Sequence, residues 1–387
     1  HVTELSAKLN DWGILVGCLL NEGLALNDDP RTYLSEPQYP DVHCDLFLTW
    51  NEPHQNQLRE TKFVTPPMNA VAVGVPRFDF YCKPWSAYYI KPPTTKRTRV
   101  LLNTTFALSH FFKRSPEERK ALYRSLGDGK IPIALDYNQM IDDHYHGRAS
   151  LINFLKPLLE SEDYDSTLRP HPREDVTFYD HLIADLPPKQ QELIKVDADS
   201  PVFSAILNSD ITINCEDCTT SAESWVAKKP TITLTFAKNP AFFTDFYASC
   251  SPQVNEPEGL IPAVKKALEH PAQTDFQEPR QAYLDKWLYK TDGKSALRAA
   301  NEIKRVLVEK DPKPKIPFTF SGTRRGIKVK LFRAIDEPGH TKLKFMIRKA
   351  LFNEKGKMPI RYRDYLKVIR PSDVRKARQL LRSIAPE

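Results

Sequence analysis

Short runs of apolar, mostly branched residues alternate with amphipathic stretches at the start of the chain. The runs at 13–20, 42–50 and 70–75 predict buried strands, and the apolar spacing over 5–12 predicts the end of a helix. Buried strands joined by helices indicate a parallel sheet with right-handed crossovers. Domains of this kind usually open with a strand, so we expect that the natural N-terminus, with one further strand, is missing.

The pattern is interrupted at 83–98, where three prolines predict a linker, and then restarts. Strands are predicted at 99–105, 166–168, 194–196, 211–214 and 230–236, and helices at 149–160, 202–207 and 219–227. Pro116 and the acids after it mark another helix start. Two α/β units with a Pro-rich hinge predict two Rossmann-like domains facing a cleft.

We therefore divide the chain into four parts. They are an N-terminal, acceptor-side domain at 1–95, a donor-binding domain at 96–275, closing helices at 276–312 and a basic tail at 313–387. The last boundary rests on the helix-breaking prolines between 310 and 317.

Composition narrows the class of protein. With 41% hydrophobic and 27% charged residues among 387, the chain is globular rather than disordered. It contains neither GxGxxG nor GxxxxGK[ST], which argues against a plain dinucleotide site or a P-loop. No apolar run reaches the ~20 residues that span a bilayer. Six scattered cysteines make a disulfide framework improbable and indicate the cytoplasm.

Charge is distributed unevenly. From Lys313 onward the chain carries 21 Lys and Arg against 6 Asp and Glu, a net +15, whereas the rest carries −8. Apolar residues such as Phe332 and Phe345 lie among the bases. This pattern predicts a basic helical tail that holds the protein at an anionic membrane surface. The alternative is that the tail packs on the acidic body.

Three hydroxyls mark one candidate site. Thr219, Thr220 and Ser221 follow the strand at 211–214 and open a helix. Free N–H groups at a helix start favour phosphate, and Glu223, one turn later, is placed to accept from ribose hydroxyls. The alternative is ordinary N-capping by Thr or Ser.

A second candidate site is Arg169-Pro-His-Pro-Arg-Glu174, after a strand. The prolines restrict the backbone around His171, and Arg169, His171 and Arg173 together suit phosphate oxygens. The alternative is a loop with exposed charges.

Two acids follow predicted strands. Glu22 comes after the strand at 13–20, and Asp136 follows one at 131–135. Carboxylates at the ends of parallel strands point into the crevice of an open sheet, where they can act as base or nucleophile. The alternative is a solvated loop acid.

Two further groups resemble metal ligands. His144 and His146 lie beside Asp142 and Asp143, but a polar helix or loop explains them better. The lone CxxC formed by Cys215 to Cys218 lacks a second pair or suitably spaced histidines, so we predict no metal.

Taken in order, five segments resemble bacterial surface-carbohydrate biosynthesis proteins of the GT-B glycosyltransferase type. They are Leu20–Gly23, Val73–Asp79, Val100–Phe106, Leu168–Glu174 and Asp210–Pro230, within a stretch from about residue 5 to 270. The resemblance implies a GT-B-like α/β fold. It does not extend to the basic tail.

The His-Pro pair with its downstream Ser/Thr cluster is also similar to the donor-binding pair of capsule Kdo transferases and bacterial sialyl- and polysialyltransferases. This likeness implies that His171, together with the residues 219–221, holds the phosphate of a CMP-activated sugar. It implies Glu22 as the catalytic carboxylate and places Asn103 and Thr104 along the cleft. The family's first strand and glycine turn are absent, so acceptor contacts from there cannot be named.

The leading hypothesis is a metal-independent glycosyltransferase without cofactor, which moves a sugar from a CMP-ulosonic acid or UDP-sugar to a glycan or lipid-linked glycan. It would work in the cytoplasm, peripherally attached to the inner membrane. Two alternatives remain. One is a sugar-nucleotide epimerase of the same fold. The other is a non-catalytic nucleic-acid-binding protein, which the basic, aromatic tail suggests and the acidic body disfavours.

Overall fold

The computed structural model describes residues 2–20, 44–60, 69–125, 137–216, 218–236, 248–313, 375–379 and 382. The chain divides into two compact units. The first comprises residues 1–10 and 15–312, and the second comprises residues 11–14 and 313–387. Both sheets lie in the first unit.

The first sheet is small and wholly parallel, with the order β1-β2-β3. Its elements are α1 Val2–Asp11, β1 Gly17–Leu19, β2 Leu46–Thr49, α2 Glu52–Glu60 and β3 Asn69–Ala72. All four residues of β2 are buried, as expected for the central strand of a covered parallel sheet. The predicted strands and the predicted parallel pairing are confirmed.

The second sheet is larger, also wholly parallel, and has the order β6-β5-β4-β7-β8-β9. Its strands are β4 Thr98–Asn103, β5 Tyr164–Arg169, β6 Ile194–Val196, β7 Ile211–Cys215, β8 Thr231–Leu234 and β9 Gln253–Val254. Numbered by appearance in this sheet, the order is 3-2-1-4-5-6, that of a dinucleotide-binding Rossmann fold. The predicted α/β class with Rossmann-like sheets is confirmed.

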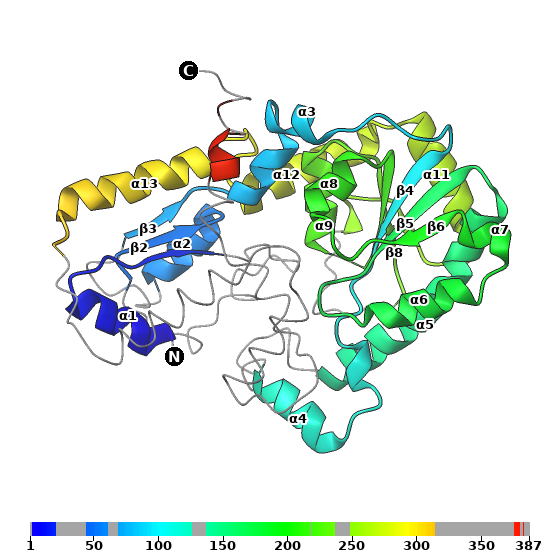
Figure 1. Cartoon of the computed structure of the whole chain (residues 1–387), viewed down its shortest axis with the longest axis horizontal. Helices are drawn as coiled ribbons and strands as arrows, with labels where there is room; N and C mark the ends of the chain where they lie inside the picture. The colour runs from blue at the N-terminus through cyan, green and yellow to red at the C-terminus, as the bar shows by residue number, and fades with distance from the viewer. Residues whose placement is uncertain are drawn as a thin grey trace. The chain divides into compact units, whose positions relative to one another are not determined.

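Helices cover both faces of this sheet (Figure 1). The helices that connect or follow its strands are α4 Pro116–Ser125, which lies away from the sheet, and α5 Tyr137–Glu160, α6 Val176–Ala184, α7 Pro188–Gln191, α8 Val202–Leu207, α9 Thr219–Val226 and α11 Leu260–Glu269, with short turns η4 Ser109–Phe111 and η6 Pro257–Gly259. The predicted start of α4 is a capping box, because Ser115 and Glu118 exchange side chain to backbone hydrogen bonds.

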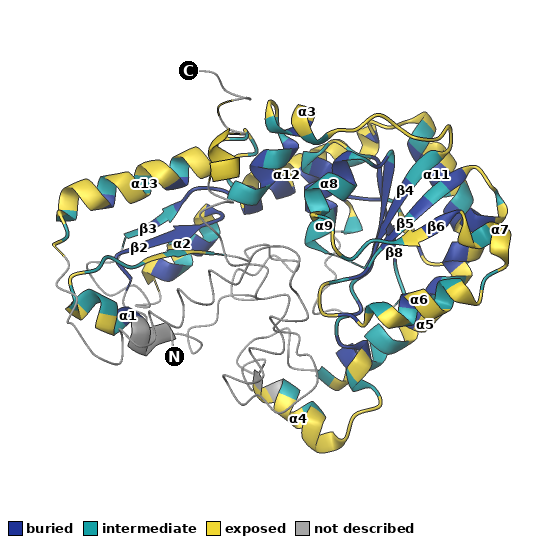
Figure 2. Ribbon diagram, viewed as in Figure 1, coloured by how far each residue is buried: buried dark blue, intermediate teal, exposed yellow. Residues whose placement is uncertain are grey.

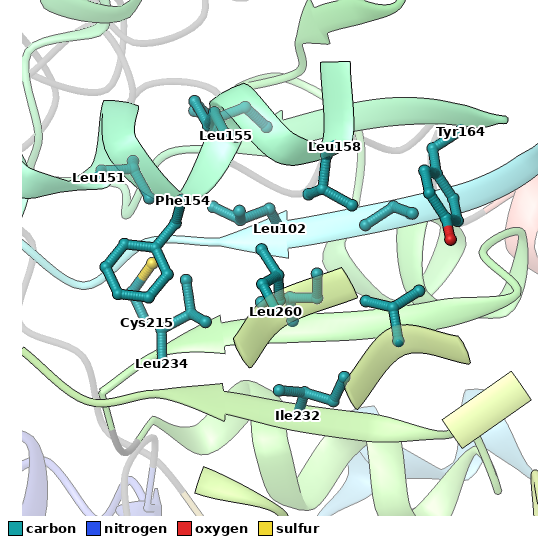
Figure 3. Close-up of a cluster of buried hydrophobic side chains, with 14 of the residues drawn as sticks. Leu102, Leu151, Phe154, Leu155, Leu158, Tyr164, Cys215, Ile232, Leu234 and Leu260 are labelled. Carbon is teal, nitrogen blue, oxygen red and sulfur yellow. The ribbon is translucent and has the colours of Figure 1, made fainter. Parts of the chain in front are cut away.

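Alternate residues of each strand face opposite layers. Leu102 packs with Leu151 and Leu155 of α5 and with Leu260 of α11, as Figure 3 shows. The neighbouring Leu101 belongs instead to a cluster with Ile206 of α8 and with Ala222 and Trp225 of α9. The strands of the second sheet are accordingly more deeply buried than the helices that cover them (Figure 2).

The chain then returns to the first sheet. Helices α12 Gln277–Leu288 and α13 Ser295–Lys310 follow η7 Thr274–Phe276, and α13 packs through Ala299 and Val306 on β2. Asp79, in η3 Pro76–Tyr81, is buried and accepts hydrogen bonds from the first backbone N–H groups of α13. The carboxylate therefore caps a helix that lies more than 200 residues later in the chain.

The segment at 83–98 is more than a linker, because it contains the helix α3 Trp85–Tyr89. The rings of Phe80 and Tyr89 pack against Phe203 with centroids 4.5 and 4.7 Å away. Aromatic burial orders a stretch whose prolines alone suggested an extended connection.

Most of the predicted basic tail lies outside the described residues, which include a helical stretch at 375–379. Across the part of the chain that the structure describes, we find no helix with the length and apolarity needed to cross a bilayer.

Candidate functional site

The candidate site lies where three parallel strands of the second sheet end. β4 lies between β5 and β7, and Asn103 is in register with Arg169 on one side and Asn214 on the other. The chain leaves β4 for α5 on one face and leaves β7 for α9 on the other face. This is the topological switch point, where open α/β sheets bind ligands beyond the carboxyl ends of their strands.

Buried amide and hydroxyl groups meet between β4, β7 and the start of α9. Asn103 Nδ2 donates to Asn214 Oδ1 at 2.8 Å, and Thr220 Oγ1 donates to the same oxygen at 3.0 Å. Asn103 Oδ1, Asn214 Nδ2 and Ser221 Oγ are buried without a hydrogen-bond partner among the described residues. Such atoms call for water or a polar ligand, since an unpaired buried polar atom is costly.

The predicted capping alternative does not fit this helix. Its N-cap position is Cys218, in extended conformation, rather than one of the three hydroxyl residues. The hydroxyl of Thr220 is directed to Asn214 instead of a helix N–H. Of the three hydroxyls, Ser221 Oγ has no hydrogen-bond partner among the described residues, and its role toward an oxyanion at the N-terminus of α9 stays a prediction.

Glu174 was not singled out by the sequence, yet it organises the loops after β4 and β5. Its Oε1 accepts hydrogen bonds from Thr104 Oγ1 at 2.7 Å, from the Phe106 N–H at 2.9 Å and from the His171 N–H at 3.0 Å. Its Oε2 accepts from the Tyr179 hydroxyl. Burial raises the pKa of Glu174, and these hydrogen bonds partly offset the increase.

A sequence signal for this role exists. Where a turn separates two residues three positions apart, the carboxylate of the second can accept a hydrogen bond from the backbone N–H of the first, as in a capping box. Glu174 does so, because its own N–H donates to the His171 carbonyl at 2.8 Å while its side chain accepts from the His171 N–H. The motif was interpreted through its bases, and its acid was overlooked.

Two histidines lie close together here. His171 Nδ1 accepts from the Arg173 N–H at 3.2 Å, and His144 Nδ1 accepts from the Leu108 N–H at 3.1 Å. In its neutral form each imidazole therefore carries its proton on Nε2. Burial, and secondly the charge of His171, lower the pKa of His144 to about 4. His144 is thus a neutral donor at physiological pH.

The polar group at 142–146 lies on α5, in agreement with the predicted polar helix. Within the described ranges no group of three or more His, Cys, Asp or Glu side chains is arranged to hold a metal ion.

The predicted phosphate-binding arginines differ in their surroundings. Arg169 Nη1 donates to the Asp197 carbonyl at 3.2 Å and approaches Ser200 Oγ at 3.4 Å. Its carboxylate partner is Asp197, at 3.9 Å. Arg173 is exposed. Arg169 is therefore anchored on the β6 side, and a phosphate contact by it stays a prediction.

Glu223 is engaged with the segment that follows the first sheet. It accepts a hydrogen bond from the Tyr81 hydroxyl, and Arg77 Nη2 lies 3.5 Å from its Oε1. Burial and the neighbouring Glu223 raise the pKa of Tyr81. A ribose-binding role for Glu223 would require this carboxylate to exchange or share partners, and it stays a prediction.

The two candidate catalytic acids, Glu22 and Asp136, lie outside the described residues. Thr219 and the other hydroxyl residues of α9, together with Asn103, Thr104 and His171, are brought to the carboxyl ends of β4, β5 and β7. The structure thus assembles the two predicted motifs at one edge of one sheet.

No family model matches the chain, and no curated protein matches it. Among solved structures the wall teichoic acid polymerase TagF is similar at 16% identity and a TM-score of 0.42, over 69% of this chain and 59% of that chain. A Listeria monocytogenes protein assigned as a UDP-N-acetylglucosamine 2-epimerase is similar at 12% identity and a TM-score of 0.42, over 82% of this chain and 74% of that chain. The glycosyltransferase SnogD from Streptomyces nogalater is similar at 14% identity and a TM-score of 0.33, over 67% of this chain and 57% of that chain. The chain spans little more than half the length of TagF.

Proposed function

We propose that the protein is a glycosyltransferase that takes a sugar from a nucleotide-activated donor, with the donor phosphate at the N-terminus of α9. One observation carries the proposal. Asn103, Asn214 and Ser221 present buried, unpartnered polar atoms at the switch point, within the described part of the chain. A phosphate ester of a nucleotide offers several acceptor oxygens to Ser221 Oγ and Asn214 Nδ2, and the positive end of the α9 dipole favours its charge.

The same residues suit the chemistry of transfer. The leaving phosphate gathers negative charge in the transition state, and fixed donors aimed at that charge usually supply the largest catalytic contribution. Ser221 Oγ and Asn214 Nδ2, beside the N-terminus of α9, supply such donors on one side. His171, which Glu174 holds by its backbone N–H, supplies an Nε2–H on the other side.

Glu22 completes the proposed mechanism as the base that deprotonates the acceptor hydroxyl, or as the nucleophile if configuration is retained. Glu22→Gln is expected to abolish transfer while donor binding persists, since the amide keeps size and polarity but cannot accept the proton. Transfer assays with parallel binding measurements check this. Near-normal transfer by the variant would move the role to Asp136.

The donor class is tested by thermal shift with CMP, CDP, UDP and GDP. A ligand at 100 times its dissociation constant adds about 2.7 kcal/mol of stability. The Thr220→Val/Ser221→Ala double variant should lose the nucleotide response. Ser224→Ala is the matched control on the same helix, because its hydroxyl donates to the Thr220 carbonyl at 2.7 Å and stays inside the helix. A response preserved in the double variant would contradict the assignment.

Product analysis separates the alternatives. A glycosyltransferase releases nucleotide only when a glycan acceptor is present or hydrolysis intervenes, whereas a sugar-nucleotide epimerase returns an isomeric nucleotide sugar without acceptor. A nucleic-acid-binding protein would do neither. We propose CMP-ulosonic acids such as CMP-Kdo, or UDP-sugars, as donors and lipid-linked glycans as acceptors, with no metal required.

The tail from Lys313 is proposed to bind an anionic membrane surface on the cytoplasmic side. Each base near such a surface contributes about 1 kcal/mol, screened by salt. The full chain should co-sediment with anionic liposomes and be released by salt, while a chain ending at Asp311 should not. Equal, salt-insensitive recovery of both on anionic and neutral vesicles would rule the membrane role out.

A further inference from the structure

Arg148, on α5, is a buried arginine without a polar partner. Only 9% of the residue is exposed. Its guanidinium carbon lies 4.1 Å from the centroid of the Phe178 ring. Among the residues that the structure describes, it forms no ion pair and no hydrogen bond. Stacking on the ring covers one face of the guanidinium and leaves its in-plane N–H donors unpaired with any described protein acceptor, open to solvent.

Arg280, on α12, shows how the same fold buries an arginine for structural purposes. It is 8% exposed and also lies near aromatic rings, with Trp225 and Phe276 both at 5.7 Å. Its Nε donates to the Cys250 carbonyl at 2.6 Å, and its Nη2 donates to Gln273 Oε1 at 2.6 Å. Arg148 has no such partners among the described residues, and none of its nitrogens is among the fully buried unpartnered atoms, so its donors open to solvent, where a ligand from outside the chain can reach them.

The groups around Arg148 are donors and cations. His144 lies one turn earlier on α5 and, with Nδ1 occupied by the Leu108 N–H, presents an Nε2–H. Burial, and then the charges of Arg114 and Arg148, lower the pKa of His110 of η4. We refer to His110, His144 and Arg148 as the basic cluster.

The acids near the basic cluster are already occupied. Asp175 is the N-cap of α6, where its Oδ1 accepts from the Thr177 N–H and hydroxyl. Glu174 accepts from the loops after β4 and β5. Neither carboxylate bonds to Arg148, so the positive charge is not neutralised by a described neighbour.

We propose that the basic cluster binds a phosphate group carried by a small substrate, at a second anion site distinct from the N-terminus of α9. Arg148 can give two parallel N–H bonds to phosphate oxygens, and His144 Nε2–H can give a third. α5 and α9 pack on opposite faces of the second sheet, so the two anion sites belong to different layers. This inference does not depend on the identity of the nucleotide donor.

The test measures the melting temperature of the full chain in inorganic phosphate and in methyl phosphate, at millimolar concentrations with KCl holding ionic strength constant. Both anions should raise the melting temperature of the parent. Arg148→Met should need at least tenfold more phosphate for the same rise, while melting no lower than the parent without phosphate, because Met keeps the packing on Phe178 and removes an unpaired charge. Arg305→Met, at an exposed ion pair on α13, is the control and should respond like the parent.

Several results would overturn the proposal. One is an unchanged phosphate response in Arg148→Met, and another is a response lost in Thr220→Val/Ser221→Ala instead. A response to inorganic phosphate but not to methyl phosphate would exclude a substrate-borne group. If Arg148→Met does not fold, Arg148→Lys keeps the charge without the paired donors, and its phosphate requirement should still rise severalfold. If Thr220→Val/Ser221→Ala loses nucleotide binding but keeps the phosphate response, the result supports a phosphate site at the basic cluster that is separate from the N-terminus of α9.

Discussion

Two neighbouring regions of the second sheet treat their buried polar groups in opposite ways. After β4 and β5, the Glu174 carboxylate accepts hydrogen bonds from Thr104, Phe106, His171 and Tyr179. After β7, Asn214 and its neighbours retain buried atoms without partners among the described residues. The Glu174 carboxylate thus has its hydrogen bonds supplied within the chain, whereas we propose that the atoms after β7 find their partners in a ligand.

The largest effect that would sharpen this contrast is expected for Glu174→Ala. The change leaves the Phe106 N–H without its acceptor, and the His171 N–H keeps only its 3.2 Å bond to Thr104 Oγ1. Each orphaned buried donor costs about 1–3 kcal/mol. The free energy of unfolding should fall by roughly 2–5 kcal/mol in urea titrations. Glu174→Gln, which keeps an acceptor oxygen, should lose much less. A Glu174→Ala protein as stable as the parent would break the comparison.

Acid should weaken the satisfied region through His144. Its pKa of about 4 lies below the ordinary value of 6.5, so the unfolded chain takes up the proton first as pH falls. The stabilising contribution is present above pH ~6.5 and is lost progressively down to about pH 4, by roughly 3 kcal/mol. Unfolding measured across this range should be less pH-dependent in His144→Gln. Parallel stability curves for parent and variant would contradict the assignment.

His171→Ala should lower turnover at least tenfold without unfolding the protein. The change removes the hydrogen bond that we propose between His171 and the donor phosphate, a contribution of roughly 1.5–3 kcal/mol. Arg173→Ala, two residues away and exposed, is the control and should change turnover less. If His171→Ala keeps full activity, His171 serves only the turn.

The smallest expected effect is on the stability of the open region. Ser221→Ala removes a hydroxyl that has no described partner and should change the free energy of unfolding by less than about 0.5 kcal/mol. Ser224→Ala breaks a helix-internal hydrogen bond and should cost about 1 kcal/mol. Equal losses in the two variants would show that Ser221 is a structural residue like Ser224.

Local pattern sufficed for much of the fold. Branched apolar runs predicted β6 and the hydrophobic stretch 202–207 predicted α8 with the bounds that the structure has. The helix α6 was missed, because its N-cap Asp175 follows a Pro-rich motif that was interpreted only as a loop. Hydrophobic periodicity depends only on residues near one another in the sequence, so helices and strands that follow it can be predicted from the sequence.

Only part of the candidate site could be predicted from the sequence. Both motifs were found because prolines and hydroxyls at strand ends are local signals. The partners of those motifs are not local: Tyr81 meets Glu223 across 142 positions, and Thr104 meets Glu174 across 70. No spacing rule predicts such pairs. The ribose-binding prediction for Glu223 overlooked Tyr81 and Arg77 for this reason.

The central claim is that the open region at α9 binds the donor phosphate. Isothermal titration of a nucleotide that stabilises the parent, and of its nucleoside, to the parent and to Thr220→Val/Ser221→Ala tests it most directly. The account predicts that the double variant keeps the nucleoside affinity and loses at least tenfold for the nucleotide, so that the phosphate no longer adds affinity. An undiminished preference for the nucleotide in the double variant would contradict it.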